Sequence, residues 1–360
     1  RLISELKETT DLPIHLHTHD TSGNGIITYS AASKAGVDIV DVAMSAMSGN
    51  TSQPSMSSLY YALVNGPRLP EITIENAQKL NHYWEDVRMY YKPFENGLNA
   101  PETEVYMHEM PGGQYSNLQQ QAKAVGLGHR WDEIKQMYHT VNLMFGDIVK
   151  VTPSSKVVGD MALFMVQNDL TEEDIYEKGE TLSFPESVVT FFQGELGQPV
   201  GGFPKKLQKI ILKGRPALNE RPGLLAESVD FNEVKKELAE KIGYEPKQDE
   251  VLSYLMYPQV FLDYQKAYNQ FGDVTLLDTP TFFQGIRLGE TINVQIERGK
   301  TLIIRLDEIG EPDIEGNRVL FFNLNGQRRE ITIKDNSIIS TVQTRLKAEP
   351  TNREQIGATM

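Results

Sequence analysis

Three of the seven histidines in the sequence lie close together in one short stretch, Leu12–Gly23. In an extended strand successive side chains point to opposite faces, so His15, His17 and His19 would share one face. Neutral imidazole is the commonest metal ligand in proteins, and this spacing therefore favours a metal site. The alternative is that these histidines are ordinary core or surface residues of a strand.

The elements around this stretch alternate between helix and strand, which is typical of a parallel sheet. Because the chain opens with a helix that runs into the histidine strand, we expect further elements upstream of residue 1. Residues 1–72 are then the last part of a (β/α)8 TIM barrel, a fold that carries its chemistry at the C-terminal ends of the strands. The elements expected beside the histidine strand are helices at Arg1–Lys7, Thr28–Gly36 and Met56–Val64 and a strand at Val37–Met44.

Residues 73–246 show helical patterns without strands, separated by clusters of proline and glycine. No fixed period of self-similarity is visible, so we expect a helical funnel that extends the barrel and not a repeat array. The helices expected from here to residue 271 are Glu75–Tyr91, Gln114–Val125, Trp131–Phe145, Ser154–Asn168, Glu172–Lys178, Pro185–Leu196, Lys205–Lys213, Phe231–Ile242 and Glu250–Phe271.

Residues 247–346 are expected to form a separate small α+β domain rich in antiparallel strands. The dipeptide Asn325-Gly326 is a strong signal for a hairpin turn. The polar tail, residues 347–360, is expected to be a linker. The strands expected are Thr291–Ile296, Thr301–Leu306, Arg318–Leu324 and Arg328–Lys334.

The composition narrows the class of protein. A net charge of −14 argues against a nucleic-acid binder, which needs a basic surface. No apolar run approaches the roughly 20 residues that cross a bilayer, so we expect no membrane partner. The absence of cysteine excludes thiolate chemistry and leaves histidine and oxygen as metal ligands. These features fit a cytoplasmic enzyme.

Several motifs together carry a family resemblance. The H-x-H-D-T-x-G pattern at His17–Gly23 resembles metal-dependent (β/α)8 barrels of the aldolase and lyase type, which include the carboxyltransferase domains of biotin enzymes. Three further stretches, Glu109–Asn117, Lys150–Asp160 and Gly197–Pro204, resemble the pyruvate carboxylase family of biotin-dependent carboxylases. The likeness covers nearly all of the chain, and Ile356–Met360 resembles the junction into a biotinyl carrier domain.

The resemblance implies an activity. The chain would transfer the carboxyl group of carboxybiotin to pyruvate and form oxaloacetate, within an ATP- and bicarbonate-dependent pyruvate carboxylase of anaplerosis and gluconeogenesis. Biotin would arrive on a carrier domain outside this chain, and ATP and Mg would bind at an absent biotin carboxylase domain. The small β domain would be the allosteric and tetramerisation domain of a homotetramer, with acetyl-CoA as activator.

The resemblance also assigns residues. His17 and His19 would bind a divalent metal, Mn or Zn, while His15 would lie one layer deeper and the remaining ligands and pyruvate-binding groups upstream of residue 1. Thr152 would relay the proton between pyruvate and biotin, and Ser155 and Lys156 would line the biotin pocket.

The pattern around Thr152 adds an expectation about geometry. With Pro153 as the first helical residue, Thr152 would be a helix N-cap beside outward-pointing backbone N–H groups, which could stabilise an enolate or carboxylate. A purely capping threonine is the alternative.

Two rival functions remain open on the sequence. A decarboxylase or transcarboxylase subunit could use the same barrel, although we expect glutamine at the position of Lys156 in the decarboxylase relatives. Alternatively the segment acts mainly as a scaffold that holds an oligomer and anchors the carrier, with the β domain from about Phe282 as the candidate.

Overall fold

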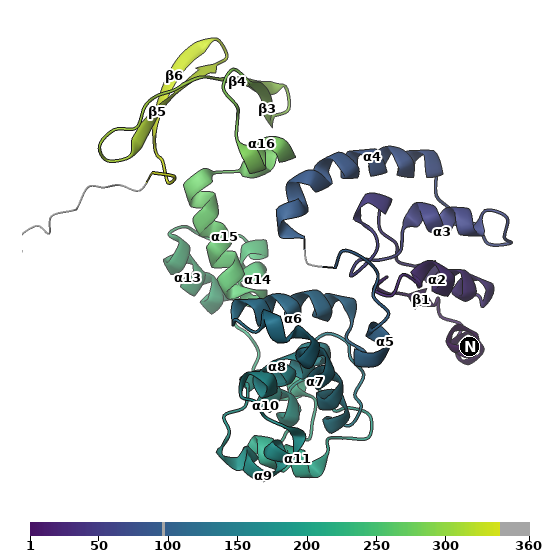
Figure 1. The fold of residues 1–360 in the computed structure, drawn as a ribbon. Coiled ribbons are helices and arrows are strands. Elements are labelled where there is room, and N and C mark those ends of the chain that lie inside the picture. Colours follow the sequence, from purple (N-terminus) through teal and green to yellow (C-terminus); the bar gives the residue numbers. More distant parts are fainter. Residues whose placement is uncertain (96–97, 339–360) are drawn as a thin grey trace, which may run out of the picture. The chain divides into compact units, whose positions relative to one another are not determined.

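The computed structural model describes residues 1–95 and 98–338. The chain divides into two compact units, Arg1–Val229 and the part that begins at Asp230 (Figure 1). Helix α13 (Phe231–Ile242) belongs to the second unit, because its fully buried Leu238 packs into a core with Val251 and Phe261 of the helices that follow.

Two short parallel strands open the first unit. β1 (His15–Leu16) pairs with β2 (Ile39–Val40), with His15 opposite Ile39 and Leu16 opposite Val40. The predicted β-α-β order is confirmed, but both strands are shorter than predicted. The described residues include only this pair of parallel strands, so the rest of the barrel stays a prediction. The helices around the pair are α1 (Leu2–Thr9), α2 (Gly25–Lys34) and α3 (Met56–Leu63).

A helical bundle forms the rest of the first unit and contains its largest core. The fully buried side chains include Leu118, Tyr138, Met161 and Phe192, and they come from four different helices. The helices predicted between Glu75 and Lys213 are confirmed, with their ends within one turn. The helices are α4 (Ile74–Tyr91), α5 (Val105–His108), α6 (Gly112–Ala124), α7 (Trp131–Met144), α8 (Ser154–Gln167), α9 (Glu172–Lys178), α10 (Glu186–Gln193), α11 (Lys205–Leu212) and α12 (Pro222–Leu225).

One predicted helix is wrong. The stretch Glu250–Phe271 is not continuous but divides into α14 (Gln248–Met256) and α15 (Pro258–Phe271). Pro258 causes the break, because its ring disfavours helical backbone at the preceding residue and it lacks the N–H that would continue the hydrogen-bond ladder. Tyr257 accordingly leaves the helical conformation, with φ −146° and ψ 69°.

A four-stranded antiparallel sheet ends the described chain. Its strand order is β3-β4-β5-β6, and the four predicted strands are confirmed. The β5–β6 turn has positive φ at both central residues, 49° at Asn325 and 85° at Gly326, as a two-residue hairpin requires. The predicted linker at residues 347–360 lies outside the described residues. Before the sheet comes the short helix α16 (Thr279–Gln284), and the strands are β3 (Thr291–Glu297), β4 (Lys300–Ile309), β5 (Asn317–Leu324) and β6 (Gln327–Lys334).

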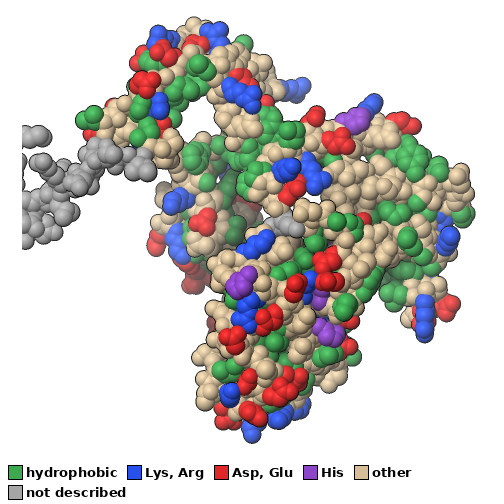
Figure 2. Space-filling model, in the orientation of Figure 1, with side chains coloured by type: hydrophobic (Ala, Val, Ile, Leu, Met, Phe, Trp, Pro, Cys, Tyr) green, Lys and Arg blue, Asp and Glu red, His purple; other side chains and the backbone are tan. Residues whose placement is uncertain are grey.

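The surface carries charges of both signs. On the face shown in Figure 2, acidic and basic side chains are interspersed over the helices and over the sheet. None of the helices among the described residues combines the length and the apolar character that a bilayer crossing requires.

The bundle core predicts a contrast between two leucines. Leu118 of α6 is fully buried, whereas Leu224 of α12 is 74% exposed. Leu118→Ala should lower the free energy of unfolding by about 2–5 kcal/mol, because it removes buried surface and leaves a cavity. Leu224→Ala should change it by less than about 0.5 kcal/mol. Urea unfolding followed by tryptophan fluorescence would measure both; equal effects would contradict the assigned core.

Candidate functional site

A cavity of about 1000 Å³ lies within the first unit, between the histidine loop and the helical bundle. One side is formed by the loop that follows β1, another by the first turn of α6, and a third by the segment that leads into α8. The five predicted site residues, which lie far apart in the sequence, all line this cavity: His17, His19, Thr152, Ser155 and Lys156.

His17 is oriented by a carboxylate on the neighbouring strand segment. Its Nδ1 lies 2.7 Å from Oδ2 of Asp41, and Nε2 of His15 lies 2.7 Å from the other oxygen, Oδ1. Hydrogen bonds from His15 and then His17 hold the pKa of Asp41 below its usual range. An ionised carboxylate only accepts hydrogen bonds, so Nδ1 of His17 carries the proton and Nε2 keeps a free lone pair. His15 does not line the cavity and acts through Asp41.

His19 is oriented differently from the other two histidines. Its Nδ1 lies 2.6 Å from the backbone carbonyl oxygen of Thr51, which can only accept, so its Nε2 also keeps a lone pair. The prediction that all three histidines share one strand face is therefore wrong, because β1 ends at Leu16 and the following residues form a loop. The rings of His17 and His19 still lie edge to face with centroids 5.2 Å apart.

The histidine pair suits two ligands of a divalent metal. Each ring has its Nδ1 occupied by an oxygen acceptor, which fixes the tautomer that leaves Nε2 available, as in most metal-binding histidines. Within the described part of the chain, no group of three or more His, Asp or Glu side chains is arranged to hold a metal ion. A metal ion at this place would need ligands in addition to these two histidines.

Asp20, the acidic residue of the motif, has a structural task. Its Oδ1 accepts a hydrogen bond of 2.8 Å from the backbone N–H of Gly25 at the start of α2. A Cβ at Gly25 would lie 2.7 Å from the same oxygen and 2.4 Å from Cγ of Pro54, so only glycine fits there. This contact fixes the turn that follows His19.

Gly112 brings the bundle against the histidine loop. A Cβ at this position would lie 2.8 Å from both Cβ and Cγ of His19, whereas a Cβ at Gly113 would have only His19 Cε1 nearby, at 4.0 Å. Close packing against His19 is therefore the reason for a glycine at position 112. The first turn of α6 therefore fixes the imidazole of His19 from the side of the bundle.

The segment leading into α8 differs from its prediction. The helix begins at Ser154, Pro153 is in the cap position, and Thr152 precedes the cap, so the predicted N-cap role of Thr152 is wrong. The N–H groups of Ser155 and Lys156 donate to the carbonyls of Val151 and Pro153. These two groups do not point outward as predicted.

The hydroxyl of Ser154 stabilises the turn that precedes α8. It lies 2.7 Å from the carbonyl oxygen of Val149 and 2.6 Å from that of Val151, and it accepts from the Val151 N–H at 3.2 Å. These contacts close a tight turn before the helix begins.

Thr152 and Ser155 both line the cavity. Thr152 is exposed, and its hydroxyl makes no hydrogen bond to any residue that the structure describes. Ser155 is 6% exposed, and its carbonyl accepts a hydrogen bond of 3.3 Å from the Tyr138 hydroxyl. A free hydroxyl beside a fixed neighbour can both donate to and accept from a bound molecule.

Lys156 lines the cavity but is paired within its own helix. Its Nζ lies 2.5 Å from Oδ2 of Asp160, an oxygen to which the Ser187 hydroxyl also donates, at 2.6 Å. This pair offsets the unfavourable position of a cation in the first turn of a helix.

Sequence reasoning missed Gln114 and Asp41. Gln114 of α6 lines the cavity, is only 8% exposed, and its Nε2 has no hydrogen-bond partner among the described residues. A Cβ at Gly159 would lie 2.3 Å from this nitrogen, so α8 leaves room for the amide. Gln114 lies within the stretch Glu109–Asn117 that carried the resemblance, which was the available signal for it.

Comparisons with known proteins agree with this geometry. A family model described as a conserved carboxylase domain matches residues 105–305. The chain is 60% identical over 359 residues to pyruvate carboxylase of Bacillus subtilis and 56% identical to that of Staphylococcus aureus. In both cases the match covers 100% of this chain and 31% of the relative, so the chain spans about a third of the length of these proteins.

Solved structures give the same assignment. The carboxyl transferase domain of Rhizobium etli pyruvate carboxylase, solved with pyruvate and biocytin, superposes with a TM-score of 0.88 at 48% identity, over 93% of this chain and 56% of that one. The complete multifunctional enzyme from the same organism gives a TM-score of 0.87 over 94% of this chain and 33% of that one. The chain belongs to the conserved carboxylase domain family and is similar along its whole length to pyruvate carboxylases.

Proposed function

We propose that this chain supplies part of a carboxyltransferase centre that moves the carboxyl group of carboxybiotin onto pyruvate, giving oxaloacetate. The single observation that carries the proposal is the cavity that brings His17 and His19 together with Thr152. Carboxyl transfer to a methyl ketone needs both a polarised carbonyl and a proton relay, and this cavity has residues suited to each. The Rhizobium etli domain solved with pyruvate and biocytin supports the same substrates.

The reaction balances through one proton. The methyl group of pyruvate loses a proton to form the enolate, the N–C bond to the carboxyl group of carboxybiotin breaks, and a C–C bond forms at the former methyl carbon. The ureido nitrogen that loses the carboxyl group must gain a proton. The Thr152 hydroxyl relays the proton from one to the other, because it can accept and donate in turn without holding a charge.

The histidines position the substrate side. A divalent metal at Nε2 of His17 and His19, Mn or Zn, would supply the Lewis acid that polarises a substrate oxygen. Asp41 and the Thr51 carbonyl keep both rings in the tautomer that this requires. On the opposite wall, we assign Ser155 and Lys156 to the pocket for the biotin ring.

The remaining parts of the proposal concern the whole protein. We propose a pyruvate carboxylase with a biotin carboxylase domain that uses ATP and Mg, a biotinyl carrier domain, a homotetrameric assembly and acetyl-CoA activation. The match to the complete multifunctional enzyme of Rhizobium etli supports this wider reading. The division into residues 1–72, 73–246, 247–346 and 347–360, the roles in anaplerosis and gluconeogenesis, and the cytoplasmic location stay predictions.

The first test concerns the proton relay. In the full-length protein, Thr152→Ala should lower oxaloacetate formation at least about 100-fold, because it removes the group that moves the proton. Thr152→Ser keeps a hydroxyl and should retain most of the rate. Biotin-dependent ATP cleavage, measured on the same samples, should persist in both variants. Rapid oxaloacetate formation by the alanine variant would exclude Thr152 from the relay.

The second test concerns Asp41. Asp41→Asn should weaken metal binding roughly 10–100-fold, since His15 and His17 contact different oxygens and the NH2 group that replaces one of them cannot accept a hydrogen bond. Metal content after dialysis against a chelator, measured by mass spectrometry, reports this without reference to activity. Asp38→Asn, on the same segment but bonded to Lys7 and Ile14, is the matched control and should keep its metal. Equal metal content in both variants would contradict the assignment.

The third test uses the adjacent glycines of α6. Gly112→Ala should displace His19 and reduce both metal affinity and carboxyl transfer, because its Cβ would lie 2.8 Å from the imidazole. Gly113→Ala adds the same methyl group where the nearest described atom is 4.0 Å away, and it should be tolerated. Titration of the metal-free protein with Mn²⁺, followed by electron paramagnetic resonance, would compare the two; similar affinities would show that the close approach has no role.

A further inference from the structure

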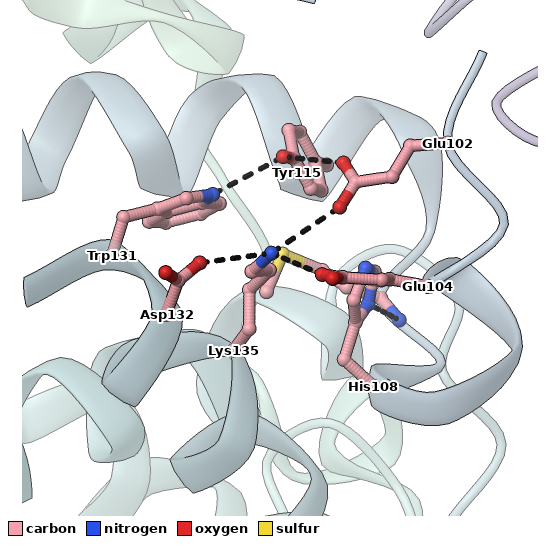
Figure 3. Close-up of polar contacts among 8 residues, drawn as sticks. Glu102, Glu104, His108, Tyr115, Trp131, Asp132 and Lys135 are labelled. Carbon is pink, nitrogen blue, oxygen red and sulfur yellow. Dashed lines mark hydrogen bonds and ion pairs between the residues drawn. The ribbon is translucent and has the colours of Figure 1, made fainter.

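An ion cluster lies beside the cavity, centred on the buried Lys135 of α7. The side chain is 9% exposed and its Nζ contacts three carboxylates: Glu102 Oε1 at 3.2 Å, Asp132 Oδ1 at 3.1 Å, and Glu104 (Figure 3). Burial alone lowers the pKa of Lys135, but the hydrogen bonds to Glu104, Asp132 and Glu102 raise it above the usual range. The ammonium group is therefore charged and holds carboxylates from two separate parts of the chain.

Glu102 is held from both of its oxygens. While Oε1 contacts Lys135, Oε2 accepts a hydrogen bond of 3.0 Å from the Tyr115 hydroxyl. That hydroxyl in turn accepts from Nε1 of Trp131 at 3.1 Å, as Figure 3 shows. Residues of α6 and α7 thus fix the carboxylate, and this leaves the backbone of Glu102 in one position.

The segment around Glu102 is hydrogen-bonded to the loop that follows the histidines. The Glu102 N–H donates to the carbonyl of Thr21 at 2.7 Å, two residues after His19. The Tyr106 hydroxyl donates to Ser22 Oγ at 3.1 Å and accepts from Asn24 Nδ2 at 3.2 Å.

The packing at this junction is also tight. A Cβ on Gly23 would lie 3.0 Å from Cβ of Pro101, so the two segments approach without space between them. Hydrogen bonds, with an apolar contact beside them, therefore join residues 101–106 to the histidine loop.

Helix α7 reaches the other wall of the cavity three residues further along. Tyr138 is fully buried and its hydroxyl donates to the carbonyl of Ser155 at 3.3 Å. Residues i and i+3 lie on the same face of a helix, so Lys135 and Tyr138 form adjacent points on one rigid element. One of them holds the histidine loop through Glu102, and the other holds the start of α8.

We propose that Lys135 and Glu102 are positioning residues that fix the histidine loop relative to Thr152 and Ser155, with α7 as the rigid element that sets the separation. The inference rests on the proposed function, since only a reaction that uses both walls of the cavity depends on their separation. Neither residue touches the cavity centre; each acts through the loop carrying His17 and His19. A misplacement of about 1 Å between reacting groups can cost about 100-fold in rate.

The experiment uses the full-length protein and four variants. Lys135→Met removes the positive charge that holds three carboxylates together. Glu102→Gln removes one negative charge but keeps the shape of the side chain. Lys135→Arg keeps the positive charge. Lys178→Met is the matched control, because Lys178 pairs with Asp174 on the exposed side of α9 at 2.5 Å. Hydrogen exchange followed by mass spectrometry would be read at residues 18–26, at 98–106 and in α8.

The expected result is faster exchange at both residues 98–106 and 18–26 in Lys135→Met, with α8 unchanged. Oxaloacetate formation should fall tenfold to 100-fold through kcat while metal content stays constant. Glu102→Gln should show a smaller change in the same two peptides, Lys135→Arg should recover most of the loss, and Lys178→Met should stay within twofold of the parent protein.

The exchange data separate this proposal from the proposed function. They measure the connection between residues 101–106 and the histidine loop, even if the carboxyl-transfer assignment fails. Unchanged exchange at residues 18–26 in Lys135→Met would overturn the proposal, as would a rate loss no greater than that of Lys178→Met. If Lys135→Met also speeds hydrogen exchange in α8, the bundle has unfolded. The test then rests on the Glu102→Gln variant. Unchanged exchange at 18–26 in that variant would then overturn the proposal.

Discussion

The cavity depends on the close approach of helix α6 to the histidine loop at Gly112. A Cβ atom at this position would lie only 2.8 Å from His19. Glycine, which has no Cβ, is therefore the residue that lets the backbone come so near the imidazole. The same helix carries Gln114 into the cavity and contributes Leu118 to the bundle core. The contact between the histidine loop and the helical bundle is therefore made by a helix that also packs into the largest core.

The histidines obtain their orientation from partners that are distant in sequence. Asp41 lies on the segment after β2, and the Thr51 carbonyl lies in the loop before α3, yet both meet Nδ1 atoms of neighbouring histidines. A carboxylate and a backbone carbonyl both act as pure acceptors toward an N–H, so two chemically different groups give the same tautomer. Two histidines with their Nδ1 atoms occupied therefore line one cavity, although the strand ends before either of them.

The sequence was informative where local physics decides the structure. Helix ends in the bundle and the hairpin at Asn325-Gly326 follow from periodicity and turn chemistry. It failed where a local signal was overruled. Pro258 broke a helix that the apolar pattern alone would continue, and the cap position of α8 fell on Pro153 and not on Thr152.

The partners of the histidines could not be predicted for a further reason. The role of Asp41 depends on which residues of β1 and β2 stand opposite each other, and this register is a tertiary property that no stretch of sequence states. The fit of Gly112 against His19 likewise requires two segments to meet that lie far apart along the chain. Composition and spacing could nominate these residue types but could not pair them.

Two hydroxyls flank Pro153, and their environments give them different tasks. The hydroxyl of Ser154 contacts two carbonyls and accepts one N–H, so its hydrogen-bonding capacity is used within the turn. Thr152 faces the cavity and has no such partner among the described residues. A proton relay needs a hydroxyl with both its donor and its acceptor function free. Because the hydrogen bonds of the turn occupy the Ser154 hydroxyl, Thr152 is the hydroxyl of this segment that we propose for the relay.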